Sequence, residues 1–384
     1  MAEFSDIRYD ARVLKQADTL ARTGYFVHLI MYNSSTSKSK RAISNNIEKI
    51  EIPFKKRYST RTRLDKILRI ISFFNVFAQY FFRLLFFKAD YYHAHNYFVG
   101  WIIYLSSLIH GGKFIYDCHE IIWTEKEYYH KFGVYIERFL LLKASLAICP
   151  SSDRTKLIKD YYGLKKNLIP LYNYPLINKA RKLESNILKN ELGAHQDTNI
   201  LLYTGMLSVR TRLQDNIIKS LPSLPDNVIF VMIGFGHPDE ISYLSETANK
   251  YNIKNRLFIL PPKPYIHLKK YIECADIGIS LLKDNGLANR YHALNKFYDY
   301  VSCGIAVLAS NFPSFRKDIL KNPVGPIGRV CDEENPVSIS DNIRFLIEDA
   351  KRLESFKNNA MKLHKYYWNW EKQAKILVDS YNKL

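Results

Sequence analysis

The chain has 384 residues, of which 47% are hydrophobic, and it carries 56 Lys and Arg residues against 37 Asp and Glu residues. This length suits two domains, and the apolar content excludes a disordered chain. The net charge of +19 favours an anionic partner, which is nucleic acid, an anionic membrane surface or a phosphorylated substrate.

The cysteine pattern and the start of the chain indicate where the protein works. The five cysteines form no CxxC pair, which argues against a disulfide framework or a zinc site and favours a reducing cytoplasm. The start has no apolar signal-peptide core. The longest uncharged apolar run, residues 70–82, is shorter than the roughly 20 residues that span a bilayer. We therefore expect a cytoplasmic protein.

The beginning of the chain predicts a helix at 10–24 and a strand at 25–30. The preceding letters MAEF are too short for the central strand with which a doubly wound domain begins. We therefore expect that this strand is missing or that the sheet begins differently.

The remainder of the first half alternates strands and helices. Strands are predicted at 89–95, 113–117 and 146–150, and helices at 134–146 and 152–162, before a turn-rich linker at 172–178. The first two strands each end in a histidine-bearing loop, with His93 and His95 in one and His119 in the other. No third ligand accompanies His93 and His95, so we predict no metal site.

Residues 55–88 look like a basic amphipathic helix with a wide aromatic face. Seven Lys and Arg residues at 55–69 lead into IISFFNVFAQYFF. One reading is docking on an anionic cytoplasmic membrane leaflet. The other is a surface helix whose apolar face packs on its own sheet. The net charge favours the membrane.

The second half repeats the α/β rhythm more regularly. Strands are predicted at 198–204, 228–233, 256–260, 276–281, 305–309 and 327–331, with helices at 212–221, 238–251, 265–273, 294–302, 335–349 and 351–365. Such alternation implies a parallel sheet with right-handed crossovers. Two similar halves predict an α/β protein of two Rossmann-like domains facing a central cleft, at 1–178 and 179–366, with a final helix at 367–384 that packs back on the first domain.

The stretch 287–310 carries the strongest functional signal. Asn295 and Lys296 open a predicted helix that contains Asp299 and ends at Gly304, followed by a buried strand. Aspartate disfavours the middle of a helix, so Asp299 is either a binding residue or a polar residue on the solvent side. The polar loop before this helix lies where open α/β sheets place ligands.

Glycines at two strand ends predict a phosphate site. Gly205 ends one strand, and Gly234 and Gly236 end the next, which permits close approach of the backbone to a phosphate. Arg210 and Arg212 follow at a helix start, where charge and the helix N-terminus together suit a diphosphate. The other reading is glycines needed for packing and ordinary surface arginines.

Several segments together resemble glycosyltransferase family 4, whose members are retaining enzymes of GT-B architecture. YDARV with LARTGYFVHLI resembles the family's opening helix and strand, and ADYYHAHN and FIYDCHE resemble its acceptor-domain strand ends. LLYTGMLSVR and VMIGFG resemble the first strand ends of the donor domain. The most specific match is LNKFYDYVSCGIAVLASNFPSF, and NWEKQAKILVDSYNKL resembles the closing helix.

The resemblance implies a GT-B fold, a nucleotide diphosphate-sugar donor and no metal or other cofactor. Asp299 takes the place of the family glutamate that holds the ribose hydroxyls. The other implied roles are the N-K pair at Asn295 and Lys296, the diphosphate arginine at Arg210 or Arg212, the donor-facing histidine at His119 and an acceptor-domain helix glutamate at Glu137. Stabilisation of the leaving diphosphate then falls to the arginines, Lys296 and backbone amides near Gly205.

The leading interpretation is a retaining sugar transferase, peripheral on the inner face of the membrane, that builds a cell-surface glycan on a lipid-linked acceptor. A nucleotide-sugar 2-epimerase of the same fold is an alternative. A non-catalytic partner subunit is another, because Leu294, Tyr291 and Met206 depart from the family pattern. No RNA-binding motif appears, so we predict no nucleic-acid partner.

Overall fold

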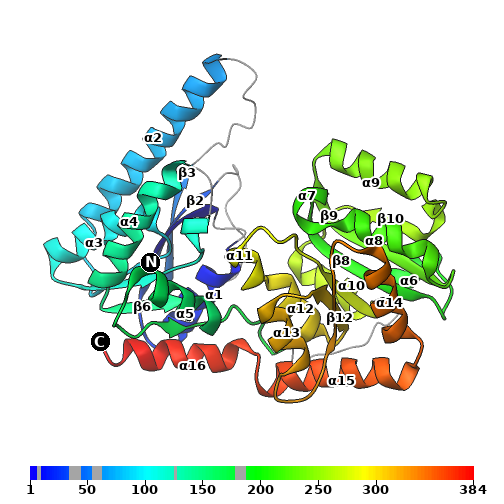
Figure 1. The fold of residues 1–384 in the computed structure, drawn as a ribbon. Coiled ribbons are helices and arrows are strands. Elements are labelled where there is room, and N and C mark those ends of the chain that lie inside the picture. The colour runs from blue at the N-terminus through cyan, green and yellow to red at the C-terminus, as the bar shows by residue number, and fades with distance from the viewer. Residues whose placement is uncertain (7–9, 34–44, 54–62, 125–127, 178–186) are drawn as a thin grey trace. The chain divides into compact units, whose positions relative to one another are not determined.

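The computed structural model describes residues 1–6, 10–33, 45–53, 63–124, 128–177 and 187–384. The chain forms two compact units. The first contains Met1–Tyr172 together with Gln373–Leu384, and the second contains Asn173–Lys372. Each unit is built on one parallel sheet with helices packed against it (Figure 1).

The first unit has a seven-stranded sheet in the order β3-β2-β1-β4-β5-β6-β7. Its strands are β1 (Ala2–Asp6), β2 (Val27–Asn33), β3 (Ile47–Pro53), β4 (Tyr91–Ala94), β5 (Lys113–Asp117), β6 (Leu146–Cys149) and β7 (Ile169–Pro170). All neighbouring strands pair in parallel. The strand order reverses at β1, which places the topological switch point of this sheet there.

The expectation that the central strand is missing was wrong. Residues 2–6 form β1, which lies between β2 and β4. Its backbone is fully engaged at its start: the Met1 carbonyl accepts from Ile30 N–H, and the Ala2 carbonyl accepts from His95 N–H. A strand held on both sides needs few residues, because its stability comes from non-local pairing rather than from its own length.

Helices cover both faces of the first sheet. They are α1 (Ala11–Arg22), α2 (Arg63–Leu85), α3 (Tyr97–His110), α4 (Tyr128–Lys143), α5 (Ser152–Tyr162) and α16 (Trp370–Tyr381), with a 3₁₀ turn η1 at Ile122–Thr124. Buried side chains of α2 to α5 share one core with Tyr92 and Ala94 of β4. His93, between them, points to the opposite face, where its Nδ1 meets the Tyr381 hydroxyl of α16 at 2.7 Å.

The second unit has a six-stranded sheet in the order β10-β9-β8-β11-β12-β13. Its strands are β8 (Asn199–Leu207), β9 (Val228–Gly236), β10 (Leu257–Leu260), β11 (Ile277–Ser280), β12 (Ala306–Ser310) and β13 (Gly328–Cys331). Its helices are α6 (Ile187–Leu192), α7 (Val209–Arg212), α8 (Gln214–Ser220), α9 (Pro238–Lys250), α10 (Tyr265–Glu273), α11 (Leu287–Arg290), α12 (Asn295–Cys303), α13 (Pro313–Leu320), α14 (Pro336–Ile347) and α15 (Ala350–Tyr366), with 3₁₀ turns η2 at Leu221–Ser223 and η3 at Lys254–Arg256. The switch point is at β8.

The segment from α12 to β12 has the structure that its sequence predicts. α12 begins at Asn295 and ends at Cys303, and the following Gly304 has a φ of 69°, the left-handed conformation of a helix C-cap. All five residues of β12 are buried, as expected for a strand with a helical layer on each face.

Among the described helices, none is both long enough and apolar enough to cross a membrane. The longest, α2, has 23 residues, and its Arg83 is exposed. Lys55, Lys56, Arg57 and Arg61 of the predicted basic helix lie outside the described residues.

Candidate functional site

Two glycines hold the ends of β8 and β9 close together in the second unit. Gly205 and Gly234 are register partners. A Cβ on Gly234 would lie 1.8 Å from the Gly205 carbonyl oxygen, and Gly205 has a φ of 113°. A Cβ on Gly236 would lie 2.9 Å from the Leu207 Cβ. Only glycine fits at Gly234, so bare backbone lines this edge of the sheet.

Lys296 lies at the start of α12, against the ring of Tyr203 from β8. Its Nζ is 3.7 Å from the ring centroid, a cation–π contact. Burial, and then the positive charge of Arg212, lower the pKa of the Lys296 ammonium well below its ordinary value. Two cations side by side disfavour each other unless an anion joins them. The pair therefore marks a place suited to a negatively charged ligand.

The two candidate arginines differ in their surroundings. Arg210 is exposed, whereas Arg212 is half-buried and close enough to interact with Lys296. Both belong to α7, which is only four residues long. A single turn has little macrodipole, so the N-terminus of this helix adds little to the binding of a diphosphate. The positive charge of Arg212 is then the main contribution of α7.

Asp299 is not on the solvent side of its helix. It is buried at 8% exposure, and its Oδ1 accepts a hydrogen bond of 2.8 Å from the Tyr265 hydroxyl at the start of α10. Asn295, one turn earlier, accepts at 2.8 Å from the side-chain amide of Asn173. The tyrosine hydroxyl shows that this carboxylate is placed to accept from hydroxyl groups.

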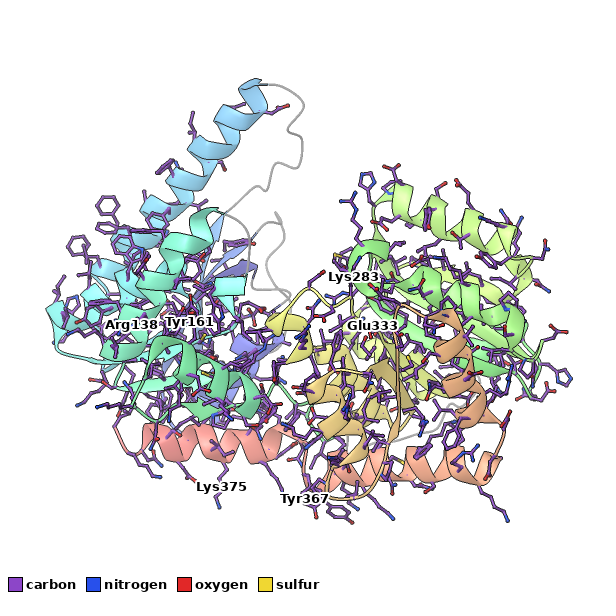
Figure 2. The ribbon with its side chains drawn as sticks, in the orientation of Figure 1. Arg138, Tyr161, Lys283, Glu333, Tyr367 and Lys375 are labelled. Atoms are coloured by element: carbon purple, nitrogen blue, oxygen red, sulfur yellow. The ribbon has the colours of Figure 1, made fainter. Side chains whose placement is uncertain are left out.

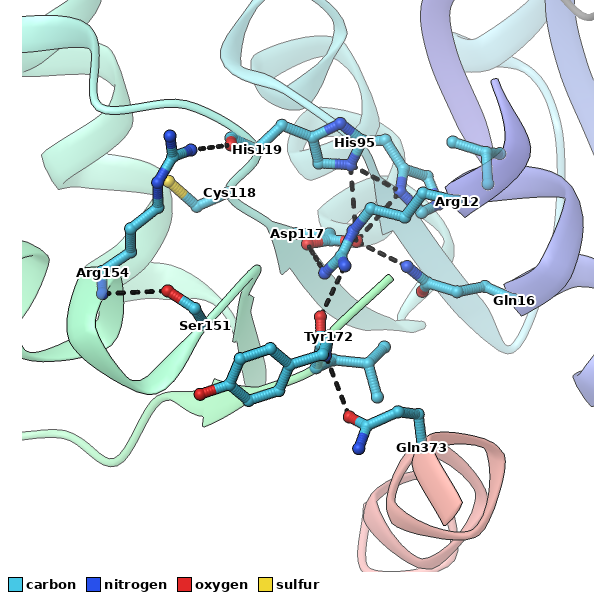
Figure 3. Close-up of polar contacts among 12 residues, drawn as sticks. Arg12, Gln16, His95, Asp117, Cys118, His119, Ser151, Arg154, Tyr172 and Gln373 are labelled. Carbon is cyan, nitrogen blue, oxygen red and sulfur yellow. Dashed lines mark hydrogen bonds and ion pairs between the residues drawn. The ribbon is translucent and has the colours of Figure 1, made fainter. Parts of the chain in front are cut away.

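In the first unit, Asp117 at the end of β5 is the centre of a buried polar cluster (Figure 3). The Arg12 guanidinium donates to both of its carboxylate oxygens, at 2.9 and 2.8 Å. The Gln16 amide donates to Oδ2 at 2.6 Å. His95 Nδ1 and His119 Nε2 lie 3.3 and 3.4 Å from the same oxygen. The cluster is at the switch point of this sheet, where such folds bind ligands.

The charges of this cluster are set by its ion pairs. Although burial alone acts in the other direction, Arg12 and His119 hold the pKa of Asp117 well below its ordinary value. Burial also acts to lower the pKa of His119, but the charge and hydrogen bond of Asp117 outweigh it and raise that pKa to about 9. Burial lowers the pKa of His95 to about 4. At neutral pH, Asp117 is therefore an anion, His119 a cation and His95 neutral.

Two overlapping sets of side chains have the spacing of metal ligands. Glu3, His95 and His119 form one set, and His93, His95 and Asp117 the other, with ligand atoms within 4.8 Å of one another. However, both oxygens of Asp117 already accept from the Arg12 guanidinium, whose positive charge opposes a second cation at this place. We assign no metal to either set.

Comparisons with known proteins agree with this geometry. Residues 184–363 match the family described as Glycosyl transferases group 1, and residues 11–173 match the family described as Glycosyltransferase Family 4. The chain belongs to glycosyltransferase family 4. The predicted family and the prediction of an enzyme are thereby confirmed.

Individual proteins are similar to this glycosyltransferase at low sequence identity. An uncharacterised glycosyltransferase of Methanocaldococcus jannaschii is 22% identical over 285 residues, which are 72% of this chain and 67% of that protein. The crystal structure of Anabaena HepE in complex with UDP and glucose has a TM-score of 0.74 at 15% identity, covering 100% of this chain and 98% of that one. WaaG, a glycosyltransferase involved in lipopolysaccharide biosynthesis, has a TM-score of 0.63 at 14% identity, covering 98% of each chain. These likenesses confirm the GT-B fold.

The predicted site residues of the glycosyltransferase fall into two groups. Gly205, Gly234, Lys296 and Arg212 lie together at the ends of β8 and β9, with Asp299 one turn further along α12. His119 lies in the first unit, with Asp117. Glu137, also predicted, is buried in the first unit and accepts hydrogen bonds from Tyr116, Cys118 and Tyr162.

Sequence reasoning missed the residues that hold each of these two groups in place. In the second unit these are Tyr203 and Tyr265, and in the first unit Arg12, Gln16 and Asp117. Only Asp117 had a local signal, because it ends a predicted strand directly before His119. The others contact the site from elements far away in the sequence.

Proposed function

We propose that this glycosyltransferase moves a sugar from a nucleotide diphosphate-sugar to a cell-surface glycan acceptor, with retention at the anomeric carbon. The proposed donor rests on one observation. Lys296 and Arg212 form a pair of cations near the backbone at Gly234, where only glycine fits, and the carboxylate of Asp299 lies one turn further along α12. The neighbour HepE, crystallised with UDP and glucose, supports a donor of this class.

Each part of a nucleotide diphosphate-sugar has a partner of matching chemistry. The diphosphate suits the charges of Lys296 and Arg212 and the exposed amides near Gly205. The ribose hydroxyls suit Asp299, which already accepts from the Tyr265 hydroxyl. The two cations also stabilise the leaving diphosphate, so this scheme needs no metal ion.

Retention is proposed to follow from attack on the same face of the sugar, assisted by the departing phosphate. We assign no protein nucleophile and no catalytic base. His119 is proposed to act as a hydrogen-bond donor rather than as a base, since at neutral pH it is a cation and carries no free lone pair.

A screen of nucleotides tests the donor site. UDP, GDP, ADP, CDP and dTDP are compared by thermal shift and calorimetry on the wild type, on Asp299→Ala and on Asp341→Ala. Asp341 is an exposed aspartate of α14 and is the matched control. We expect one nucleotide to bind selectively and Asp299→Ala to weaken it at least about tenfold, which is 1.4 kcal/mol. Equal binding by Asp299→Ala, or no binding of any nucleotide to the wild type, counts against the proposal.

The acceptor is proposed to be lipid-linked, as in the synthesis of a polysaccharide, capsule or lipopolysaccharide. The support is exposed apolar side chains of α2, α3 and α4 on the first unit, which we together call the aromatic face. α3 contacts both other helices. The most exposed members range from Leu108 at 60% to Tyr135 at 74%, and they are Phe74, Phe82, Leu108, Ile109, Phe132 and Tyr135. Exposed apolar surface of this kind marks an interaction site.

Charge favours an anionic membrane over a second copy of the chain on the aromatic face. Arg83, Arg138 and Lys143 are exposed on α2 and α4, whereas Glu137 on α4 is buried. A second copy would bring the same positive charges into contact, on a chain whose net charge is already +19. Each basic residue near an anionic leaflet contributes about 1 kcal/mol. We therefore propose peripheral binding to the inner leaflet.

Sedimentation with vesicles tests the membrane contact. Vesicles of phosphatidylglycerol and phosphatidylcholine are compared with phosphatidylcholine alone, using Phe74→Ser/Phe82→Ser and a control, Val337→Ser. Val337 is 65% exposed on α14 in the second unit. We expect binding to the anionic vesicles only, reduced in the double variant and unchanged in the control. If the wild type ignores vesicles and is a dimer that the double variant dissociates, the aromatic face belongs to a second copy.

A further inference from the structure

The strands on either side of β1 extend further than β1 does toward the amino edge of the sheet. Ala2 of β1 is the register partner of Ile30 in β2 and of Ala94 in β4. β2 begins three residues before Ile30, at Val27, and β4 begins three residues before Ala94, at Tyr91. Met1 lies in the first of the three rows that these residues form across the sheet, so two rows remain between β2 and β4.

The hydrogen bonds of Met1 and Ala2 show that these two rows continue the line of β1. The Met1 nitrogen donates to the His28 carbonyl at 2.8 Å, and the Met1 carbonyl accepts from Ile30 N–H at 2.9 Å. The Ala2 carbonyl accepts instead from His95 N–H, directly after β4, at 3.0 Å. Successive residues therefore bond alternately to the two neighbouring strands, as in a central parallel strand. Continued by one residue, this ladder directs an N–H at the Tyr91 carbonyl.

A cavity of about 430 Å³ lies at these two rows. Its walls include Met1, together with Val27 and His28 of β2 and Tyr91 and Tyr92 of β4. Neighbouring strands of a sheet lie about 4.8 Å apart, so β2 and β4, on opposite sides of β1, leave room for one extended chain between them. We call this cavity the strand slot.

The strand slot has apolar walls on both faces of the sheet. On one face its walls are Leu84, Tyr92 and Ile103, which belong to the same buried core as Ala2. On the other face, the rings of Tyr25, Tyr91 and Tyr381 pack against one another with centroids 5.4 to 5.7 Å apart. A parallel strand that is covered on both faces consists of consecutive apolar residues. The walls therefore suit an extended segment whose side chains are apolar on both sides.

The strand slot also borders the polar cluster around Asp117. His93 lines the slot, and its ring stacks on that of His95 with centroids 4.2 Å apart. His95 Nδ1 in turn lies 3.3 Å from Asp117 Oδ2. A segment in the slot therefore packs against a side chain that supports the cluster at the other end of the sheet.

We propose that the strand slot accepts an extended apolar segment joined to residue 1, which continues β1 between β2 and β4. Two residues of this segment add to the hydrogen-bond ladder, and their side chains complete the packing on both faces of the sheet. A small apolar ligand is the competing occupant, but it has no backbone with which to join the ladder. The proposal does not depend on the proposed function.

Extended chains test the proposal. Ser-Ile-Val or Ser-Gly-Ser is added directly before Met1 of the 384-residue chain, and thermal unfolding and hydrogen exchange are measured for both and for the unextended chain. We expect Ser-Ile-Val to raise the Tm of the first unit by at least about 4 °C. It should also slow exchange in segments 27–30 and 91–94 at least about tenfold, because their amides become protected. Ser-Gly-Ser is the control of equal length without apolar side chains, and it should do neither.

A third extension, Ser-Ile-Pro, separates strand pairing from apolar contact alone. Proline has no N–H to donate to the Tyr91 carbonyl, so we expect it to lose most of the stabilisation and of the protection. If Ser-Gly-Ser or Ser-Ile-Pro matches Ser-Ile-Val, the slot does not pair with a strand and the proposal is overturned. It is also overturned if Ser-Ile-Val changes neither quantity while the apolar dye anilinonaphthalene sulfonate binds the unextended chain and Tyr25→Ala abolishes that binding. The cavity then belongs to a small apolar ligand.

Discussion

Glu137 shows how a single buried side chain couples stability to pH. Its carboxyl accepts from Tyr162 at 2.8 Å, Tyr116 at 3.1 Å and the Cys118 thiol at 3.2 Å. Burial nevertheless raises the pKa of Glu137 from 4.5 to about 7. The folded state therefore binds a proton more readily than the unfolded state. The contribution of Glu137 to stability is therefore greatest below pH 4.5, falls as the pH rises to about 7 and is level above that.

We predict that Glu137→Gln removes this pH dependence, because the amide is neutral at every pH and keeps an oxygen acceptor. Relative to the wild type, the variant gains about 2–3 kcal/mol between pH 4.5 and pH 8, at about 1.4 kcal/mol per pKa unit. Urea unfolding of both proteins at several pH values measures the difference. A difference that stays constant with pH shows that Glu137 does not titrate in this range.

The site residues that lie within a family motif could be predicted from the sequence. Those that contact the site from a distant part of the sequence could not. Asn295, Lys296 and Asp299 stand within one specific run of sequence, so their place at one helix start was expected. Arg12 is 105 residues from Asp117, and an arginine in an amphipathic helix reads as a solvated charge. Arg12 is buried because it pairs with Asp117 at the end of β5, and no local sequence pattern links these two residues.

At the scale of elements, α12 is positioned by a glycine in the strand beneath it. A Cβ on Gly278 of β11 would lie 2.4 Å from Tyr300 Cδ2 and 2.5 Å from Tyr300 Cγ. Tyr300 cannot turn away freely, because its hydroxyl accepts from the Thr204 N–H at 2.9 Å. The close packing of α12 on β11 therefore sets where Lys296 and Asp299 lie.

We predict that Gly278→Ala displaces α12, destabilising the second unit by about 1–3 kcal/mol. It should also weaken nucleotide binding at least about tenfold. Thermal unfolding and calorimetry measure the two effects. The control is Gly100→Ala in α3 of the first unit, where the added Cβ meets the flexible end of Leu140. Unchanged nucleotide affinity in a destabilised Gly278→Ala would show that α12 tolerates the shift.

Elements were predictable where their signal is local. The expected helix at 294–302 and strand at 305–309 are observed at 295–303 and 306–310, because a helical apolar face, a glycine stop and an apolar run follow one another. The strand β1 was not predicted, because it is stabilised by pairing with β2 and β4 and has no local sequence signal of its own. β3, at 47–53, was not predicted at all, although Ile50 and Ile52 alternate with charged residues.

At the scale of the molecule, the first compact unit is built from two separate stretches of the sequence. The sequence divides it at 178 and 366, whereas the compact units exchange at Tyr172 and again at Gln373. The last twelve residues return to the first unit, as expected of a final helix at 367–384 that the second domain does not need. Amphipathic spacing says that a helix will be half-buried, but it does not say against which sheet.

Because the C-terminal helix packs in the first unit, a substitution in it should change the stability of that unit selectively. Leu377 and Tyr381 are buried at 1% and 2% exposure, and the Tyr381 hydroxyl contacts His93 Nδ1. We predict that Leu377→Ala destabilises the first unit by about 2–5 kcal/mol and leaves the second unit unchanged. Calorimetric unfolding with and without the nucleotide selected in the screen separates the two, because a ligand at 100 times its Kd raises the stability of the unit that binds it by about 2.7 kcal/mol. Lys375→Ala, on the exposed side of the same helix (Figure 2), is the control. If Leu377→Ala instead lowers the transition that the selected nucleotide raises, then the nucleotide site and the C-terminal helix share one cooperative unit.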